Sequence, residues 1–403
     1  MLRESSVYLV EAENGSMDLP VSPGRSRSVG AALRRADLRL YQTARHSYQW
    51  AKHERRAHID LPLRSKLQMW RRGFFAESAA IYDFPRNNPR QYLSDYQHFV
   101  RCSRINAWEG LYVRKMGLRS LLLAMGFRQA ETIAFIHQRQ ILHRPFSEDA
   151  HFIPLEELLG LLQDDPSGGG FIMKPEDGWC GEEIVLLTSR QGRVYRRRGR
   201  DEELFDFDRY MRAVEARAAR EKRDPSGVLI ERRLEQGEFW RGLFPDSANT
   251  LRLLTLWTPG EPAPFVARAV QRIGTADTVP TDNWSGGGIS APVELATGRL
   301  GEGRMHPLKG KRAEQRFTEH PDTGAVIAGA ELPGWQQVTD VVLRAAASVP
   351  FNRMAGWDVL VDAEGVPVIL EANGNSDVNL LQVHGGLLAE PNIRRFYQRV
   401  GVI

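Results

Sequence analysis

The sequence is poor in cysteine, with only Cys102 and Cys180 among its 403 residues. The two lie far apart and form no CxxC or Cys/His cluster, which excludes a zinc-binding framework and a disulfide-rich fold. Apolar runs are also short, and none approaches the roughly 18 residues that a membrane-spanning helix needs. The first residues lack the apolar segment of a signal peptide, so the sequence predicts a protein of the cytoplasm.

The charge of the chain is small overall but uneven. Of the net charge of +4, residues 1–104 hold the basic excess, with 18 Lys and Arg against 10 Asp and Glu. The arginine pairs in this part could meet nucleic acid, an anionic membrane or an acidic partner. Helices with solvated arginine faces have the same pattern, and no nucleic-acid motif accompanies the charges, so no clear nucleic-acid or membrane partner is predicted. The pairs lie at 34–35, 55–56 and 71–72.

Hydrophobic residues make up 42% of the chain, which is ordinary for a protein large enough to hold more than one core. Residues 1–100 are predicted to be a helical, basic N-terminal region with a loose arm at 15–30. Residues 101–165 are predicted to be a helical linking region. From residue 166 to the end, short β-rich runs alternate with turns and helices, which predicts an α+β domain.

Several elements are expected in this last region because their apolar residues alternate or recur at helical spacing. Helices are predicted at 203–222 and 334–348. Earlier in the chain, helices are predicted at 116–127 and 155–162. The predicted strands lie at 171–173, 184–187, 228–230, 251–257, 265–272, 357–361 and 366–371.

Three oxygen-bearing side chains are placed on two neighbouring predicted strands near the C-terminus. Asp358 lies early in the first strand, while Glu371 and Asn373 lie two apart on the second and therefore share a face. If the strands pair around the turn at 363–365, Asp358 falls across from them. Two carboxylates and one amide suit Mg²⁺, which prefers hard oxygen ligands. The same residues could instead be ordinary turn and edge residues.

Two further signals precede this pair of strands. Lys174 ends a predicted strand and is followed by a loop that contains Gly178 and Gly181, an arrangement that can hold phosphates; a solvated edge lysine is the alternative. A second apolar strand opens at Glu231 into a polar connector, whose backbone could contact adenine and whose carboxylates could contact ribose. That connector is equally a strand leaving the core.

Taken together and in order, these segments resemble the ATP-grasp superfamily, and in detail the sugar-transfer-associated ATP-grasp family. The resemblance covers roughly residues 165–390. A co-linear set of motifs is far more specific than any one of them. The motifs are at 247–252 with Thr255, 282–288, 293–298, 320–324, 356–358 and 370–373.

The resemblance implies an ATP-grasp fold, in which two α+β subdomains grip ATP. Glu371 and Asn373 follow Asp358 by 13 and 15 residues, which is similar to the metal-binding set of D-alanine:D-alanine ligases. The resemblance makes these three the ligands of Mg²⁺ and makes Lys174 a phosphate ligand, with Gly178 and Gly181 in the phosphate-covering loop. It also assigns an adenine clamp to Glu231 and the residues that follow it, Arg232 and Leu234. Glu238 is assigned to the ribose.

The family also implies a cation that stabilises the transferred phosphoryl group. Arg268 is favoured over Arg252 for this role, and an internal ion pair with Glu238 or Glu294 is the alternative for both. Lys115 is carried as a second lysine that could approach the nucleotide. His384 follows the metal strand closely enough to touch substrate, although it could equally be a loop or helix-cap residue.

The implied reaction is ATP-dependent ligation of a small-molecule carboxylate to an amine through an acyl-phosphate, with ATP and Mg²⁺ as cofactors. A phosphotransferase on the same scaffold is one alternative. A non-catalytic nucleotide-binding scaffold is another, and the presence of Asp358, Glu371, Asn373 and Lys174 argues against it.

Overall fold

The computed structural model describes residues 61–165, 168–176, 183–198, 201–221, 227–310 and 316–403, together with parts of 44–55. Residues 50–403 make up one compact unit, which is described below. The arm predicted at 15–30 lies outside the described residues. Among the residues that are described, no helix is long and apolar enough to cross a membrane.

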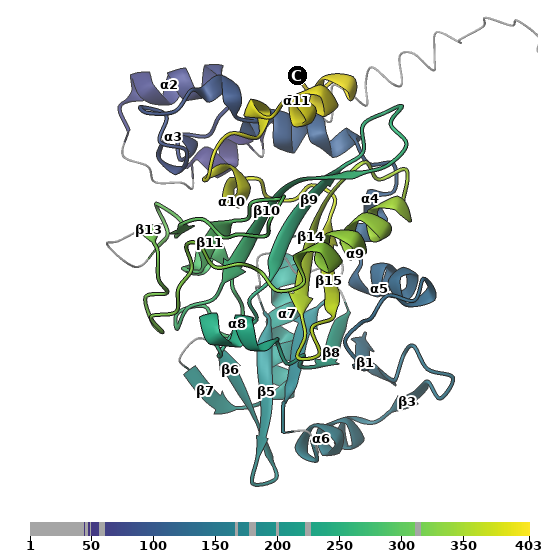
Figure 1. Ribbon diagram of the computed structural model, residues 1–403. Helices are drawn as coiled ribbons and strands as arrows, with labels where there is room; N and C mark the ends of the chain where they lie inside the picture. The colour runs from purple at the N-terminus through teal and green to yellow at the C-terminus, as the bar shows by residue number, and fades with distance from the viewer. Residues whose placement is uncertain are drawn as a thin grey trace, which may run out of the picture. The chain divides into compact units, whose positions relative to one another are not determined.

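The first layer is an eight-stranded antiparallel sheet in the order β3-β2-β1-β8-β4-β5-β6-β7 (Figure 1). Helices α6 and α7 cover one face of it, where Leu158 and Leu162 of α6 and Tyr210 and Val214 of α7 join the buried core. Burial of this apolar surface is the main stabilising contribution to the layer. Its elements are β1 Thr132–His137, β2 Gln140–His143, β3 His151–Ile153, α6 Leu155–Gln163, β4 Phe171–Pro175, β5 Val185–Arg190, β6 Arg193–Arg198, β7 Asp201–Leu204, α7 Phe207–Glu221 and β8 Val228–Arg232.

The second layer is a seven-stranded antiparallel sheet in the order β13-β12-β11-β10-β9-β14-β15. Helices α4, α5, α8 and α9 contribute apolar side chains to the core on one of its faces, with Trp357 of β14 fully buried among them. The elements are α4 Glu109–Val113, α5 Lys115–Ala124, α8 Glu238–Leu243, β9 Leu251–Leu256, β10 Phe265–Ile273, β11 Ile289–Pro292, β12 Gly303–Arg304, β13 Arg316–Phe317, α9 Trp335–Ala347, β14 Met354–Val361 and β15 Pro367–Asn373.

The opposite face of this sheet is covered only in part. Leu254, Leu256 and Val270 pack against segments from both ends of the described chain, and Figure 1 shows α2, α3, α10 and α11 gathered there. The remaining part of the same face is left for the pocket described below. The covering helices are α2 Leu63–Arg71, α3 Ser78–Ile81, α10 Asn379–Gln382 and α11 Pro391–Arg399, with short 3-10 or π turns at Pro89–Gln91, Gln97–Arg101, Cys102–Arg104, Trp284–Gly286 and Leu387–Ala389.

Most elements predicted after residue 166 lie where the alternation placed them, but the region before it differs. Residues 132–153 were assigned to a helical linking region, and they form β1, β2 and β3 instead. These residues form strands because β1 pairs antiparallel with β8. The first sheet therefore includes strands that precede residue 166. The domain boundaries at 100 and 165 stay a prediction.

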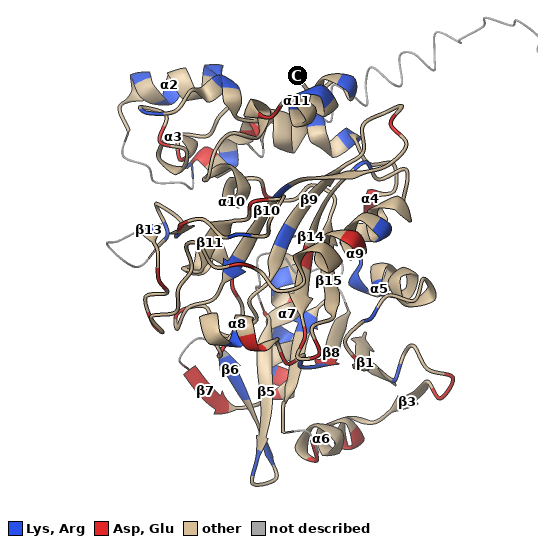
Figure 2. Cartoon of the chain, viewed as in Figure 1, with Lys and Arg blue, Asp and Glu red and all other residues tan. Residues whose placement is uncertain are grey.

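The basic N-terminal part is described only from α2 onward. Arg71 and Arg72 are exposed at the end of α2, and Figure 2 shows basic positions along this helix. Exposed arginines of this kind fit the interpretation as a solvated helix face. The pair at 34–35 and Arg56 lie outside the described residues.

The buried carboxyl group of Asp95, in the segment after α3, makes the unfolding free energy depend on pH. Asp95 accepts hydrogen bonds from the Phe75 amide and the Ser78 hydroxyl, both at 2.7 Å, and burial raises its pKa to about 7 from 3.8. Its protonated form therefore contributes stability that is fully present below pH 3.8 and is lost as the pH rises toward about 7. We expect the unfolding free energy of the wild type to fall relative to that of Asp95→Asn over this range, measured by urea unfolding. Parallel pH profiles for the two proteins would contradict this.

Candidate active site

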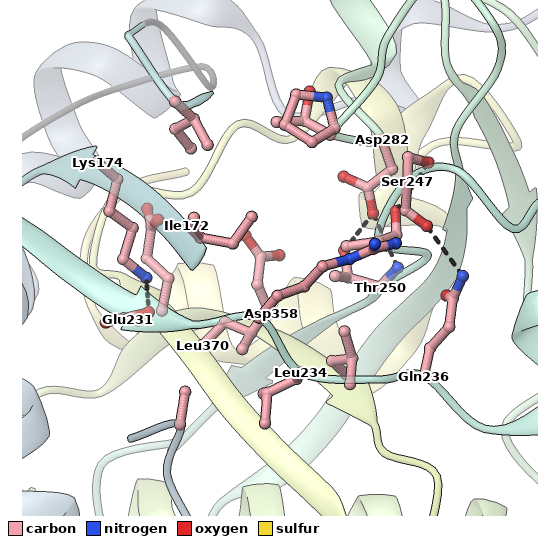
Figure 3. Close-up of a pocket in the computed structure, with 18 of the residues that line it drawn as sticks. Ile172, Lys174, Glu231, Leu234, Gln236, Ser247, Thr250, Asp282, Asp358 and Leu370 are labelled. Carbon is pink, nitrogen blue, oxygen red and sulfur yellow. Dashed lines mark hydrogen bonds and ion pairs between the residues drawn. The ribbon is translucent and has the colours of Figure 1, made fainter. Parts of the chain in front are cut away.

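A pocket of about 210 Å³ lies between the two sheets, and side chains from both line it (Figure 3). Strand alternation explains which side chains these are. Phe171 and Met173 of β4 enter the core of the first sheet, so Ile172 and Lys174 face the pocket. In the second sheet Trp357 and Val359 of β14 are core residues, so Asp358 and Leu360 face the pocket.

The charge lining the pocket favours an anion. Its cationic side chains are contributed by both sheets and slightly outnumber its carboxylates. A positively biased, partly apolar pocket suits a polyphosphate with an attached ring. The cations are Lys174, Arg232, Arg233, Arg252 and Arg272, and the carboxylates are Glu231, Asp282, Asp358 and Glu371.

On the first sheet, Glu231 is the centre of a buried ion cluster. Lys174 Nζ lies 2.8 Å from one of its carboxylate oxygens and Arg119 of α5 lies 2.5 Å from the other. Burial would raise the pKa of Glu231, but the two cations lower it below its ordinary value. Burial lowers the pKa of Lys174, and Glu231 offsets part of that shift. The two cations beside the Glu231 carboxylate offset the cost of burying it.

On the second sheet, Asp358 is held by two arginines. Arg252, its cross-strand neighbour on β9, binds both carboxylate oxygens, and Arg272 Nη1 of β10 lies 3.1 Å from Oδ2. Burial would raise the pKa of Asp358, yet the two guanidiniums hold it below its ordinary value. The carboxylate is therefore ionised, and two strong cations lie beside it.

This cluster continues into the loops around it. Arg272 Nη2 lies 2.6 Å from Asp282, whose other oxygen accepts hydrogen bonds from the Thr250 amide at 2.8 Å and hydroxyl at 2.6 Å. Burial raises the pKa of Asp282, and Arg272 opposes that shift. Arg252 Nη1 also donates to the Ser376 hydroxyl at 2.8 Å. Each arginine is thus oriented from two sides.

The residues predicted to bind magnesium are partly brought together. Asp358 lies directly opposite Glu371 in the β14–β15 pair, and Asn373 lies opposite Gly356. Asp358 and Glu371 line the pocket, while Asn373 is not among its lining residues. In the described part of the chain no three His, Cys, Asp or Glu side chains form a metal site, but this set contains only two carboxylates and an amide. Its hard oxygen donors fit Mg²⁺.

Lys115 reaches the same place from α5. Its side chain is buried, and Nζ lies 3.8 Å from Glu371 and 3.2 Å from the carbonyl oxygen of Glu176. Lys115 belongs to no recognisable sequence motif, yet it lies next to Glu371, one of the predicted metal ligands. Arg232 and Leu234 also line the pocket, as their predicted place in the adenine clamp requires. Gly178 and Gly181 lie outside the described residues.

Glu238, predicted to bind ribose, does not line the pocket. It is exposed at the start of α8. The chain turns after β8 to pair Gln236 with Asp362, which directs Gln236 into the pocket in its place. Gln236 is itself held by the carbonyl oxygens of Phe244 and Ser247 at 3.0 and 2.9 Å.

Arg268, the favoured catalytic cation, also lies elsewhere. It shares a face of β10 with Arg272 but lies four residues away, which is roughly 13 Å along a strand. That distance places it at the covered end of the sheet, where its Nη1 donates to the carbonyl of Gly385 at 3.2 Å. Arg252 and Arg272 are the cations beside Asp358. The predicted ion pairs of Arg252 or Arg268 with Glu238 or Glu294 are wrong, since their acidic partners are Asp358 and Glu390. The catalytic role of Arg268 stays a prediction.

Three residues of the site were missed from the sequence. Arg272 could have been found, because period-2 alternation puts it on the same face as Arg268. Asp282 stands inside a motif already noted at 282–288, but nothing local shows that it holds an arginine. Arg119 lies on a helix far from Glu231 in sequence, and no local signal reports it.

A family model for the sugar-transfer associated ATP-grasp family matches residues 114–396. Since this match spans well over half of the chain, the protein belongs to the sugar-transfer-associated ATP-grasp family, and its two sheets form the ATP-grasp fold that the motifs predicted. No curated protein matches the chain.

Solved structures similar to the chain include an L-amino acid ligase from Bacillus licheniformis, a D-alanine–D-alanine ligase from Bacillus anthracis complexed with ATP, and a biotin carboxylase from Campylobacter jejuni. Their sequence identities to it are 11%, 14% and 12%, with TM-scores of 0.32, 0.30 and 0.43. The similarity covers 66%, 66% and 77% of this chain. It covers 41%, 56% and 52% of theirs, so the chain spans about half the length of these structures.

Proposed function

We propose that the protein is an ATP-dependent ligase that joins a carboxylate to an amine through an acyl-phosphate. The observation that carries the proposal is a single pocket in which a lysine of one sheet faces two carboxylates and two arginines of the other. Membership of an ATP-grasp family supports ATP as the co-substrate. The acid and amine are proposed to be small molecules.

In this proposal the nucleotide lies between the sheets. Its adenine packs against the apolar lining from both layers, Ile172, Leu234 and Leu360, with the backbone after Glu231 contacting the ring edge. Lys174, which now bonds Glu231 at 2.8 Å, is close enough to the pocket to bind a phosphate oxygen as a point charge. Glu238 is not among the lining residues, and Gln236, which does line the pocket, has its amide bonded to Phe244, Ser247 and Asn249, so no side chain is assigned to the ribose.

Asp358, Glu371 and Asn373 would hold Mg²⁺ at the other end of the nucleotide. When bound, the metal ion would neutralise charge on the β- and γ-phosphates. Asp358 is ionised because Arg252 and Arg272 lower its pKa, and its carboxylate would be shared between these arginines and the metal ion. Lys115, 3.8 Å from Glu371, balances the charge of the second carboxylate.

The reaction then needs positioning and charge stabilisation more than acid–base chemistry. A substrate carboxylate oxygen attacks the γ-phosphorus, the bond to the bridging oxygen of ADP breaks, and an acyl-phosphate forms. The amine attacks the acyl carbon, phosphate leaves, and the amine proton departs. Arg252 and Arg272, oriented by Ser376 and Asp282, are placed to stabilise the negative charge that develops in both steps.

Hydroxylamine trapping tests the reaction class. Purified protein is incubated with MgATP, hydroxylamine and a panel of amino acids and sugar acids. A ligase should convert its acid to a hydroxamate with release of ADP and phosphate, because hydroxylamine replaces the amine. Stable transfer of phosphate to a hydroxyl, with no hydroxamate, would identify a phosphotransferase, and an absence of ADP release with every acid would favour a nucleotide-binding scaffold.

A further inference from the structure

A second hollow, of about 580 Å³, lies on the described unit away from the nucleotide pocket. It brings together Arg268 of β10, His384 and the stretch from Asn87 to Tyr92, and so it contains two residues for which the proposed reaction has no use. The two cavities share no lining residue. Arg268 and Arg272 are roughly 13 Å apart along one strand face, which separates the hollow from Asp358.

The charge of Arg268 is poorly matched by its surroundings. Its side chain is only 16% exposed, yet within the described part of the chain its one hydrogen bond is the contact of Nη1 with the Gly385 carbonyl at 3.2 Å. The nearest carboxylate, Glu390, is 3.9 Å away and 58% exposed. A guanidinium has five N–H donors in a planar fork, so most of those of Arg268 have no acceptor among the described residues. Burial lowers the pKa of this side chain, which is the signature of a cation that lacks full compensation.

Apart from Glu390 and Tyr92, the other ionisable groups lining the hollow each have a close partner. Arg299 lies 3.0 Å from Glu331, and Glu294 accepts a hydrogen bond of 2.6 Å from Thr297. His384 is neutral, because burial together with Arg304 and Arg268 lowers its pKa to about 3, and its ring bonds the Ser290 hydroxyl at 3.0 Å. Among the described residues that line the hollow, Arg268 is thus the cation with the weakest pairing, because its only acidic partner is the exposed Glu390 at 3.9 Å.

The rest of the lining indicates the class of ligand. Gln91 presents an exposed amide that pairs well with hydroxyl groups, Asn87 adds its amide oxygen while its NH2 donates to the Tyr82 carbonyl at 2.8 Å, and Glu390 adds an acceptor. Leu300 and Ala389 provide apolar contact. We propose that this hollow is a second ligand site, which binds a small polyhydroxylated carboxylate of the uronate type, with its carboxylate on Arg268. An arginine fork matches a carboxylate bidentately, and the amides match the ring hydroxyls.

Ligand-observed NMR titration of the full chain tests this with D-glucuronate as the probe and D-glucose as the uncharged comparison. D-Glucuronate should bind saturably and D-glucose at least tenfold more weakly, because only the former offers a carboxylate. Arg268→Gln should weaken D-glucuronate at least tenfold. Arg299→Gln is the matched control, since Arg299 lines the same hollow but already has Glu331, and its affinity should change less than threefold.

A second variant covers the case in which Arg268→Gln disturbs the loop at Gly385. Ala389 is exposed at the rim, so Ala389→Glu leaves every contact of Arg268 in place while adding a competing carboxylate. It should melt within about 2 °C of the wild type and lose D-glucuronate binding. Equal binding of the two sugars by the wild type, no saturable binding of D-glucuronate, or unchanged binding by a folded Ala389→Glu protein would each overturn the proposal. None of these outcomes bears on the ligase reaction, which uses the other pocket.

Discussion

Replacing Glu371 with glutamine is expected to lower MgATP-dependent ADP release by on the order of 10²–10³-fold while the protein stays folded. The substitution removes one of the two proposed metal carboxylates but keeps the size of the side chain. Glu371 is 28% exposed and its ion pair with Lys115 is long, at 3.8 Å, so the loss in unfolding free energy should stay under about 1 kcal/mol. ADP release and urea unfolding of the same preparation measure the two effects.

Asp358→Asn is the matched comparison, since Asp358 lies directly opposite Glu371 in the strand pair. This variant should also lose ADP release, but it leaves Arg252 and Arg272 without their shared buried carboxylate. Breaking a buried ion pair in this way costs about 3–5 kcal/mol. The two variants should therefore differ. Both should lose ADP release, but only Asp358→Asn should lose stability. ADP release from Glu371→Gln at the wild-type rate would remove the metal assignment.

Replacing Glu231 with glutamine is expected to lower the unfolding free energy by about 3–5 kcal/mol. The change leaves Lys174 and Arg119 close together without the carboxylate that lies 2.8 and 2.5 Å from them. Burial already lowers the pKa of Lys174, and loss of Glu231 should lower it further. Urea unfolding near neutral pH measures the stability.

The control for this prediction is Glu131→Gln. Glu131 also forms an ion pair with an arginine, Arg232 at 2.7 Å, but it is 57% exposed, and solvent screens the pair. Its loss should cost less than about 1 kcal/mol. If the two variants unfolded at the same urea concentration, the buried ion cluster around Glu231 would not stabilise the protein more than an exposed ion pair does. MgATP binding by Glu231→Gln, measured separately by calorimetry, should weaken as well, since the adenine clamp begins at this residue.

Predictions from the sequence succeeded where the interaction is local. The turn at 363–365 joins two strands of alternating character, and a hairpin with a short turn has only a few registers, so Asp358 was correctly expected opposite Glu371. Lys174 was also correctly expected on the strand that begins at Phe171, since it lies in β4. Glu231 came into reach of Lys174 because β4 and β8 pair side by side, which a strand pattern alone does not report.

What the sequence could not report is how far a side chain lies from the pocket, and which distant segment its element contacts. Arg268 and Arg272 have the same chemistry and the same strand face, and only the position of the covering helices decides that Arg272 enters the pocket and Arg268 does not. Glu238 was displaced because the backbone pairs Gln236 with Asp362, a contact between segments far apart in the chain. The strands at 132–153 were missed for a similar reason, since their partner β8 lies about a hundred residues later.

By itself, the sequence determined the ATP-grasp family, the α+β fold and the hairpin that carries Asp358 and Glu371, because motifs, alternation and a short turn act over a few residues. Only the tertiary structure decided that Arg119 balances Glu231, that Arg252 and Arg272 share Asp358, and that Arg268 belongs to a separate hollow. Such pairings depend on how sheets and helices pack. The free energy of burying charged groups selects among those packings after the local elements have formed.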